Sequence, residues 1–182
     1  MNKIVWRGKI DGKDIIIRYP KISDAKTARN FINKISKEKS FLMIQGKQLS
    51  LKEEKKLLKK WIKDIKRKSM IKLMALHKNE IIGSTDIHLN SGAQKHIGGL
   101  GAAVAKDFRG KGLGKLLMKL LLQESRENLK ELKIITLEVF AINKIAKNLY
   151  KKFGFKEYGR LPRGLFRRNK YTDGILMYKK IR

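Results

Sequence analysis

A glycine-rich turn between an apolar strand and an apolar helix limits what this chain can fold into more than any other segment. The turn reads Arg109-Gly110-Lys111-Gly112-Leu113-Gly114 and follows a run of small residues that includes Ala102, Ala103 and Val104. Glycine permits positive φ angles and a close approach of the backbone to a ligand. The N–H groups at a helix start, with the positive end of the helix dipole, attract phosphate groups. We therefore expect this segment to bind a pyrophosphate, with Arg109 and Lys111 adding positive charge.

Two better-known phosphate-binding motifs do not match this turn. A P-loop needs glycine at the position of Arg109 and serine or threonine at the position of Leu116. A dinucleotide-binding turn needs a third glycine at Leu117, after Gly112 and Gly114. Both motifs are excluded. An ordinary basic turn before a helix stays open as the alternative when the segment is considered alone.

The residues that follow the turn distinguish these interpretations. An apolar helical run leads to Leu137-Glu138-Val139, then to Asn143 and to Tyr150-Lys151-Lys152-Phe153-Gly154-Phe155. The pattern Arg-x-x-Gly-x-Gly followed by Asn-x6-Tyr resembles the acetyl-coenzyme A (acetyl-CoA) site of the GNAT superfamily of N-acetyltransferases. The Leu-Glu-Val sequence and its spacing to Asn143 and Tyr150 are most similar to the ribosomal-protein alanine N-acetyltransferase-like branch. The specific resemblance covers Val104 to Phe155; the Arg-rich closing segment and the Phe140-Ala141 pair depart from that branch.

This resemblance implies a fold, a co-substrate and a set of binding residues. The fold would be α/β (α+β), the acyl-CoA N-acyltransferase fold, with a twisted, mostly antiparallel mixed sheet flanked by helices. The co-substrate would be acetyl-CoA, with no metal, and the enzyme would transfer acetyl directly to a primary amine. The strand of small residues would separate from its neighbour so that its backbone can bond the pantetheine arm. The implied cofactor-binding residues are Ala102, Ala103, Val104, Arg109, Gly110, Lys111, Gly112, Leu113, Gly114, Asn143 and Tyr150.

Glu138 and Tyr150 are the candidate catalytic residues. Glu138 lies in an otherwise apolar strand, and a desolvated carboxylate is suited to accept a proton as a general base. A structural ion pair is the alternative for Glu138, and His88, His96 and Asp86 are other candidate bases. By resemblance, Tyr150 would donate a hydrogen bond or a proton to the departing thiolate; packing in the core is its alternative. Asn143 can cap a helix as well as contact the coenzyme.

Apolar periodicity predicts one α/β domain over residues 1–182, without repeats or linkers. We expect strands at 3–10, 14–19, 70–77, 80–89, 96–106, 133–140, 155–161 and 174–180. Helices are expected after Ser23 or Asp24, from Ser50 to about Lys68, and over 113–129 and 143–153. The first two helices, the Phe41 to Gln45 loop and the segment Arg163 to Asp173 would wall the amine site. In that segment Asp173 could bind a substrate ammonium or pair with an arginine.

The charge of the chain leaves its partners open. The sequence has 45 Lys and Arg against 16 Asp and Glu, a formal net charge of +29. Such a surface binds nucleic acid or ribosomes in a salt-sensitive way, yet a lysine-rich proteome gives the same bias. The chain has no cysteine and no apolar run long enough for a signal peptide or membrane span, so we expect a cytoplasmic protein. A basic nucleic-acid- or ribosome-associated binding module, an acetyl-CoA sensor and a homodimer are alternatives that the sequence leaves undecided.

Overall fold

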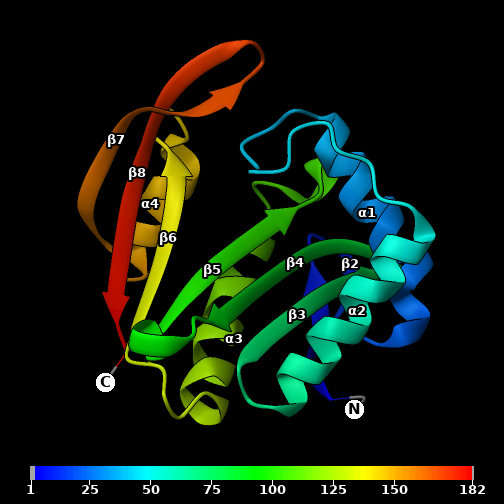
Figure 1. The fold of residues 1–182 in the computed structure, drawn as a ribbon. Helices are drawn as coiled ribbons and strands as arrows, with labels where there is room; N and C mark the ends of the chain where they lie inside the picture. The colour runs from blue at the N-terminus through cyan, green and yellow to red at the C-terminus, as the bar shows by residue number, and fades with distance from the viewer. Residues whose placement is uncertain (1–2, 182) are drawn as a thin grey trace.

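Residues 3–181 are described by a computed structural model, so the outermost residues of the predicted domain lie outside the described part. The strands of this part are β1 (Ile4–Ile10), β2 (Lys13–Arg18), β3 (Met70–His77), β4 (Glu80–Leu89), β5 (Ile97–Val104), β6 (Ile134–Phe140), β7 (Lys156–Arg167) and β8 (Lys170–Lys180). Its α-helices are α1 (Ala25–Lys37), α2 (Leu51–Lys66), α3 (Leu113–Asn128) and α4 (Lys144–Lys152) (Figure 1). No described helix is long and apolar enough to cross a membrane.

The eight described strands form a single sheet in the order β1-β2-β3-β4-β5-β6-β8-β7. Every neighbouring pair is antiparallel except β5 and β6, which run parallel. The predicted mixed, mostly antiparallel sheet with flanking helices is therefore confirmed. Figure 1 shows that β5 and β6 lie close together at one end and move apart toward the other.

Helices cover both faces of the sheet because β3 and β4 alternate their apolar side chains between two cores. Met74 and Ile81 pack with the buried face of α1, which includes Phe31. Leu73 belongs to the larger cluster, which contains Leu117 and the other buried leucines of α3. Successive strand residues point to opposite faces, so two layers of core follow from one apolar sequence. Figure 1 shows α1 and α2 together on one side of the strands and α3 on the other.

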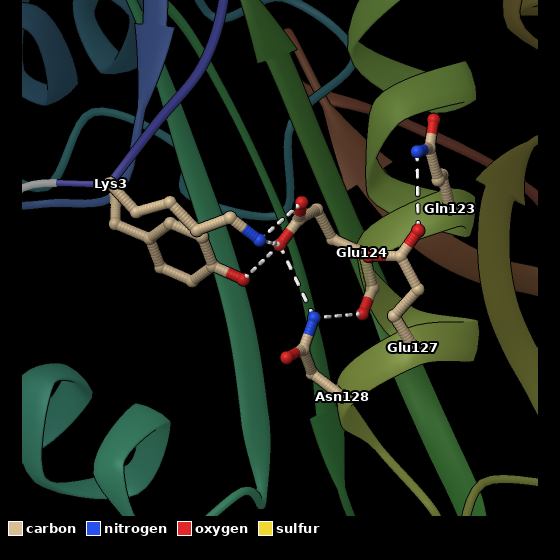
Figure 2. A network of polar contacts seen from close by, with 6 residues as sticks. Lys3, Gln123, Glu124, Glu127 and Asn128 are labelled. Atoms are coloured by element: carbon tan, nitrogen blue, oxygen red, sulfur yellow. Dashed lines mark hydrogen bonds and ion pairs between the residues drawn. The ribbon is translucent and has the colours of Figure 1, made fainter.

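Polar contacts join the edge of the sheet to α3. Glu124 is buried on α3, and its carboxylate accepts hydrogen bonds from Lys3 Nζ at 2.8 Å and from the Tyr19 hydroxyl at 2.7 Å (Figure 2). Asn128 adds a bond to the Glu124 carbonyl at 2.8 Å. Burial of the Tyr19 ring, with the Glu124 carboxylate beside it, raises the pKa of the Tyr19 hydroxyl. A buried carboxylate is tolerated there because Lys3, Tyr19 and Asn128 all donate hydrogen bonds to it.

The helix starts follow the predicted residues, with one difference at α1. Ser50 accepts from Glu53 N–H at 3.2 Å and Glu53 accepts from Ser50 N–H at 2.7 Å, which is the predicted capping box of α2. Asp24 precedes α1 but makes no side-chain cap, because its carboxylate is paired with Arg18 at 2.7 Å. The two hydrogen bonds between the buried Arg18 guanidinium and the Asp24 carboxylate use the oxygens that would otherwise cap the helix.

The two closing strands are longer than predicted, and the loop placed between them was wrong. Strands were expected at 155–161 and 174–180, whereas β7 and β8 form a hairpin whose turn is Arg168-Asn169. Both turn residues have positive φ, 49° and 60°, as a two-residue hairpin turn requires. Pro162 and Gly164 interrupt the strand pattern in the sequence. In the structure they lie within β7, where the pairing with β8 shifts its register between Leu161 and Leu165.

Candidate active site

The site begins where β5 separates from β6. Strand β6 pairs with β5 only through Ile97, Gly98 and Gly99, yet it pairs with β8 along its whole length. From Leu100 to Val104, β5 therefore keeps its β4 partner and has a free edge toward β6. Backbone N–H and C=O groups on such an edge need hydrogen-bond partners, which an extended ligand can supply. This is the separation of strands that the family resemblance implied for Ala102, Ala103 and Val104.

The turn after β5 presents unpaired backbone donors. Gly110 and Gly112 have φ of 75° and 86°, and neither has an atom within 4 Å of where a Cβ would lie. The first backbone bond of α3 runs from Leu116 N–H to the Gly112 carbonyl at 3.0 Å. The N–H groups of Leu113 and Gly114 come before that bond and have no acceptor in the helix. The geometry is that of an anion site, and its open space fits a pyrophosphate.

The two basic side chains of the turn have partners within the protein. Arg109 donates Nε–H to the Val104 carbonyl at 2.8 Å and Nη2–H to Glu38 at 2.6 Å. Lys111 Nζ is 2.7 Å from a carboxylate oxygen of Asp11. This hydrogen bond and ion pair raise the pKa of Lys111 and lower the pKa of Asp11. Arg109 thus fastens the turn to the end of β5, while both cations keep their charge beside the unpaired N–H groups.

A cavity of about 390 Å³ opens beside the free edge of β5. One wall holds Leu100, Gly101, Ala102 and Ala103. The facing wall is formed by residues of β6 and α4, namely Glu138, Val139, Asn143, Ala146 and Tyr150. The cavity thus brings together five of the predicted site residues, namely Ala102, Ala103, Glu138, Asn143 and Tyr150, whereas Val104 and the turn from Arg109 to Gly114 do not line it. It extends from there under α1 and α2.

Glu138 depends on a glycine in the neighbouring strand. Its side chain is half-buried, lines the cavity and has no hydrogen bond or ion pair with the residues that the structure describes. A Cβ on Gly174 of β8 would lie 2.1 Å from Glu138 Oε1 and 3.1 Å from its Cδ. The carboxylate therefore rests over Gly174, in space that any other residue would fill. The ion-pair alternative for Glu138 does not occur among the described residues.

Tyr150 faces the same cavity from α4. Its ring contacts Phe155 with centroids 5.8 Å apart and packs against the larger core, so the packing alternative is partly correct. Its hydroxyl has no hydrogen-bond partner within residues 3–181. Burial raises the pKa of Tyr150, so this hydroxyl is a donor throughout the neutral range. Asn143 lies seven residues earlier and caps α4 by accepting from Ala146 N–H at 3.2 Å, as predicted.

The predicted amine-site walls are only partly in place. Helices α1 and α2 and the Phe41 to Ile44 loop line the cavity, but no residue from Arg163 to Asp173 does. Asp173 instead pairs with Arg160 and accepts from Arg163 N–H at 2.9 Å, and these bonds lower the pKa of Asp173. The segment belongs instead to the β7–β8 hairpin, from which Arg167 stacks 4.2 Å from the Phe41 ring and donates to the Lys39 carbonyl at 2.9 Å.

The other candidate bases lie at different places in the structure. Asp86 lines the cavity, whereas His88 and His96 do not. His88 points to Asp64 of α2, with Nε2 3.7 Å from its carboxylate, and the His96 carbonyl accepts from the backbone that leads into β6. Asp86 and His88 share a face of β4, but His88 lies two residues further along the strand, beside Asp64 near the end of α2. Among the candidate bases, Glu138 and Asp86 are therefore the ones that line the cavity.

Two charged residues of the cavity, Lys72 and Glu54, received no role from the sequence. Lys72 is buried, lies 2.9 Å from Asp86 Oδ1 and stacks 4.2 Å from the Trp61 ring. Glu54 on α2 is only 2% exposed. A lysine in the apolar run Met70 to His77 was a usable signal, since a charge among buried strand residues needs a partner. Glu54 gave none, because it follows Glu53 in a polar helix start.

The whole arrangement matches known proteins. A model of the acetyltransferase (GNAT) family matches residues 38–155. The chain belongs to this family. That matched segment includes the turn, Glu138 and Tyr150, so the resemblance drawn from the sequence is confirmed, and the protein is a GNAT N-acetyltransferase. No curated protein sequence matches the chain.

Solved structures agree with this family over nearly the whole chain. A GNAT-family acetyltransferase from Streptococcus pneumoniae is 29% identical, with a TM-score of 0.84, and the match covers 92% of this chain and 99% of that one. A ribosomal-protein-alanine N-acetyltransferase from Brucella melitensis is 20% identical, with a TM-score of 0.77 and coverages of 90% and 98%. The protein yncA of Salmonella typhimurium, solved with its cofactor acetyl-CoA, is 15% identical, with a TM-score of 0.79 and coverages of 92% and 94%. The second and third show a shared fold.

Proposed function

We propose that this GNAT protein transfers the acetyl group of acetyl-CoA directly to a primary amine, at a protein N-terminus or on a small molecule. The observation that carries the proposal is the cavity that joins the free edge of β5 to Glu138 and Tyr150. The similar ribosomal-protein-alanine N-acetyltransferase and the acetyl-CoA bound by yncA support the acceptor and donor classes. The continuous sheet supports the prediction of one N-acetyltransferase domain over residues 1–182.

The residues present fit acetyl-CoA, which when bound supplies an activated acetyl thioester. The unpaired N–H groups of Gly110 to Gly114 would hold the pyrophosphate, with the charges of Arg109 and Lys111 beside it. The backbone of Ala102, Ala103 and Val104 would bond the pantetheine arm along the free edge. Asn143 would contact the coenzyme from the start of α4.

Glu138 would act on the attacking amine and Tyr150 on the departing sulfur. Glu138 would accept the proton of the amine, directly or through water, as the amine nitrogen bonds to the acetyl carbon. Tyr150 would donate a hydrogen bond to the sulfur as the carbon–sulfur bond breaks. Reference pKa values near 8.5 for a thiol and 10 for a phenol make full proton transfer uphill by about 2 kcal/mol. Because burial raises the pKa of Tyr150 further, hydrogen bonding to the thiolate is the favoured role.

The pKa of the acceptor amine determines how strongly a general base must assist its deprotonation. An α-amine has a reference pKa near 7.7–8.0 and is partly neutral at physiological pH, whereas a lysine amine near 10.4 is not. A single half-buried carboxylate suits the α-amine better. A cytoplasmic location, a homodimer and weak association with nucleic acid or ribosomes belong to the same proposal as secondary features. The net charge of +29 supports only the last of these.

Release of free thiol from acetyl-CoA, measured against peptides, amino acids and polyamines, tests this function. We expect acceptor-dependent release that falls at least about tenfold in Tyr150→Phe, as loss of a transition-state hydrogen bond predicts. Tyr158→Phe is the matched control, because Tyr158 is exposed on β7 and does not line the cavity. Binding of acetyl-CoA without release from any acceptor would favour a sensor. Neither binding nor release would favour a nucleic-acid- or ribosome-binding module.

A further inference from the structure

The part of the cavity under α1 and α2 is an apolar groove. Its lining comes from two helices, the 41–44 loop and two strands, and consists of Ala28, Phe31, Ile32, Ile35, Phe41, Leu42, Met43, Ile44, Leu49, Leu57, Trp61, Met74 and Ile81. Most of these side chains are buried or half-buried, while Phe41, Met43 and Ile44 are exposed at the loop. The binding of apolar groups in such a groove removes apolar surface from water on both sides.

The few charged groups of this cavity are mostly acidic, against the trend of the chain. Glu54, Asp86 and Glu138 line it, and Lys72 is the one cation among its described lining residues. Lys72 Nζ is already paired with Asp86 at 2.9 Å. On a chain whose net charge is +29, a surplus of carboxylates at this place favours a cationic ligand there.

Glu54 provides a buried oxygen without a partner. The residue is 2% exposed, and its Oε2 makes no hydrogen bond with any described residue. Burial raises the pKa of Glu54, and the nearby Lys72 ammonium acts in the opposite direction. A buried polar atom of this kind needs a hydrogen-bonding partner, and the cavity that Glu54 lines is where one can bind.

We propose that the acetyl acceptor is a primary amine with a large apolar body, whose body lies in the groove under α1 and α2 while the carboxylates of Glu54 and Asp86 favour its ammonium. This inference rests on the proposed acetyl transfer and names its substrate class. The apolar body corresponds to at least four carbons, as in a long alkyl or aromatic amine or a peptide that begins with a large apolar residue. Polyamines do not fit, because their internal ammonium groups would be buried among Phe31, Ile32 and Leu57 without partners.

Equilibrium binding to the wild-type protein tests this without acetyl transfer. By titration calorimetry, n-hexylamine should bind at least about tenfold tighter than n-propylamine, because three more methylenes enter the groove. It should also bind tighter than n-hexanol, which lacks the charge, and tighter than spermidine. Equal affinity for the two alkylamines, or tighter binding of spermidine or hexanol, would overturn the proposal. The peptides Phe-Gly-Gly and Gly-Gly-Gly, compared in the same way, show whether the apolar amine is free or a chain N-terminus.

A pair of variants tests whether the preference for hexylamine arises in the groove. Ile32→Asn puts a polar group into the lining and should reduce the hexylamine preference to about threefold or less. Ile145→Asn is the control, since Ile145 is 86% exposed on α4 and does not line the cavity, and it should keep the full preference. If both variants keep the preference, the groove is not its source. Selective binding without thiol release would contradict only the proposed function, whereas release with unselective acceptors would contradict only this inference.

Discussion

At the scale of single residues, the proposed base Glu138 keeps its position because a glycine in the neighbouring strand leaves room for it. The carboxylate lies over Gly174, where a Cβ would come within 2.1 Å of Oε1. Glycine in the interior of a strand loses packing and conformational entropy, so this position is costly unless another group uses the space. The structure gives that reason: Gly174 leaves room for a carboxylate that must stay beside the free edge of β5.

Substitution of Gly174 should therefore lower activity through the position of Glu138. We expect Gly174→Ala to lower kcat about tenfold or more with little change in the KM for acetyl-CoA, because misplacement of a catalytic group affects the chemical step. Gly159→Ala is the matched control in the facing strand, where the new Cβ meets only the Leu176 side chain at 3.2 Å. Steady-state kinetics of both variants decide the point. Equal losses in the two would make Gly174 a packing residue.

Burial of Glu54 should destabilise the protein as pH rises. The folded-state pKa of Glu54 is raised above its ordinary value of 4.5, so the folded state binds the proton more tightly than the unfolded state. Stability linked to this group is full below pH 4.5 and is lost as pH rises through the folded pKa. Glu54→Gln should thus raise the melting temperature at pH 7 and not at pH 4. Glu131→Gln, at an exposed site, should change neither value; a pH-independent gain in Glu54→Gln would contradict the linkage.

The sequence indicated the two candidate catalytic residues, but not the residues around them that matter for the proposed site. Glu138 and Tyr150 were recognisable because a carboxylate in an apolar strand and a tyrosine at fixed spacing form a local pattern. Gly174 and Glu54 were not recognised, because their roles come from contacts between β6 and β8 and from the groove under α2. Such contacts join residues far apart in the sequence, and no periodicity marks them.

At the scale of elements, the opening between β5 and β6 creates the site. Only three residue pairs join these strands, at the start of β6, whereas β6 pairs with β8 along its whole length. The glycine-rich turn then starts α3, and Arg109 holds this turn to Val104 at the end of β5 and to Glu38 after α1. A strand edge and a helix start, each with unpaired backbone groups, thus lie next to each other along the chain.

The left-handed glycine before α3 allows a direct test of this element. Gly112→Ala and Gly92→Ala both place a Cβ at a positive φ, 86° and 61°, in otherwise open space. Each should cost about 1–2 kcal/mol of stability. Only Gly112→Ala should weaken acetyl-CoA binding, about tenfold or more, because it crowds the N–H groups of the turn. Calorimetric titration measures this, and equal affinities would remove the turn from the binding site.

The order of elements was predictable, whereas their lengths near irregularities were not. Hairpin turns at Asp11-Gly12 and Lys78-Asn79 were visible as residues that tolerate positive φ. The β7–β8 turn at Arg168-Asn169 was missed, since Pro162 and Gly164 pointed to a loop before it. Pro162 fits within β7 because the pairing of β7 with β8 shifts its register there. Such a shift depends on the partner strand, so the local sequence does not reveal it.

At the scale of the whole molecule, the net charge of +29 and the acidic lining of the cavity favour partners of opposite charge at two different places. The basic exterior attracts polyanions at long range, while the cavity favours a cationic amine. Salt screens the exterior field far more than contacts inside a cavity. The two properties should therefore respond differently to ionic strength.

We expect binding to a single-stranded RNA oligonucleotide to weaken by at least about a hundredfold between 50 and 200 mM salt. Acetylation of a small amine at saturating acetyl-CoA should change less than about threefold over the same range. Fluorescence anisotropy and thiol release measure the two. A salt-insensitive RNA affinity would indicate a built nucleic-acid site and contradict the interpretation of the charge as a diffuse surface property.

The central claim is that acetyl-CoA binds between β5 and β6, with its thioester beside Tyr150 and Glu138. A crystal structure of the protein with acetyl-CoA tests this most directly. The account predicts the pyrophosphate on the N–H groups of Gly110 to Gly114, the pantetheine arm bonded to Ala102 to Val104, and the sulfur within hydrogen-bond reach of the Tyr150 hydroxyl. Acetyl-CoA bound elsewhere, or a sulfur remote from Tyr150, would contradict it.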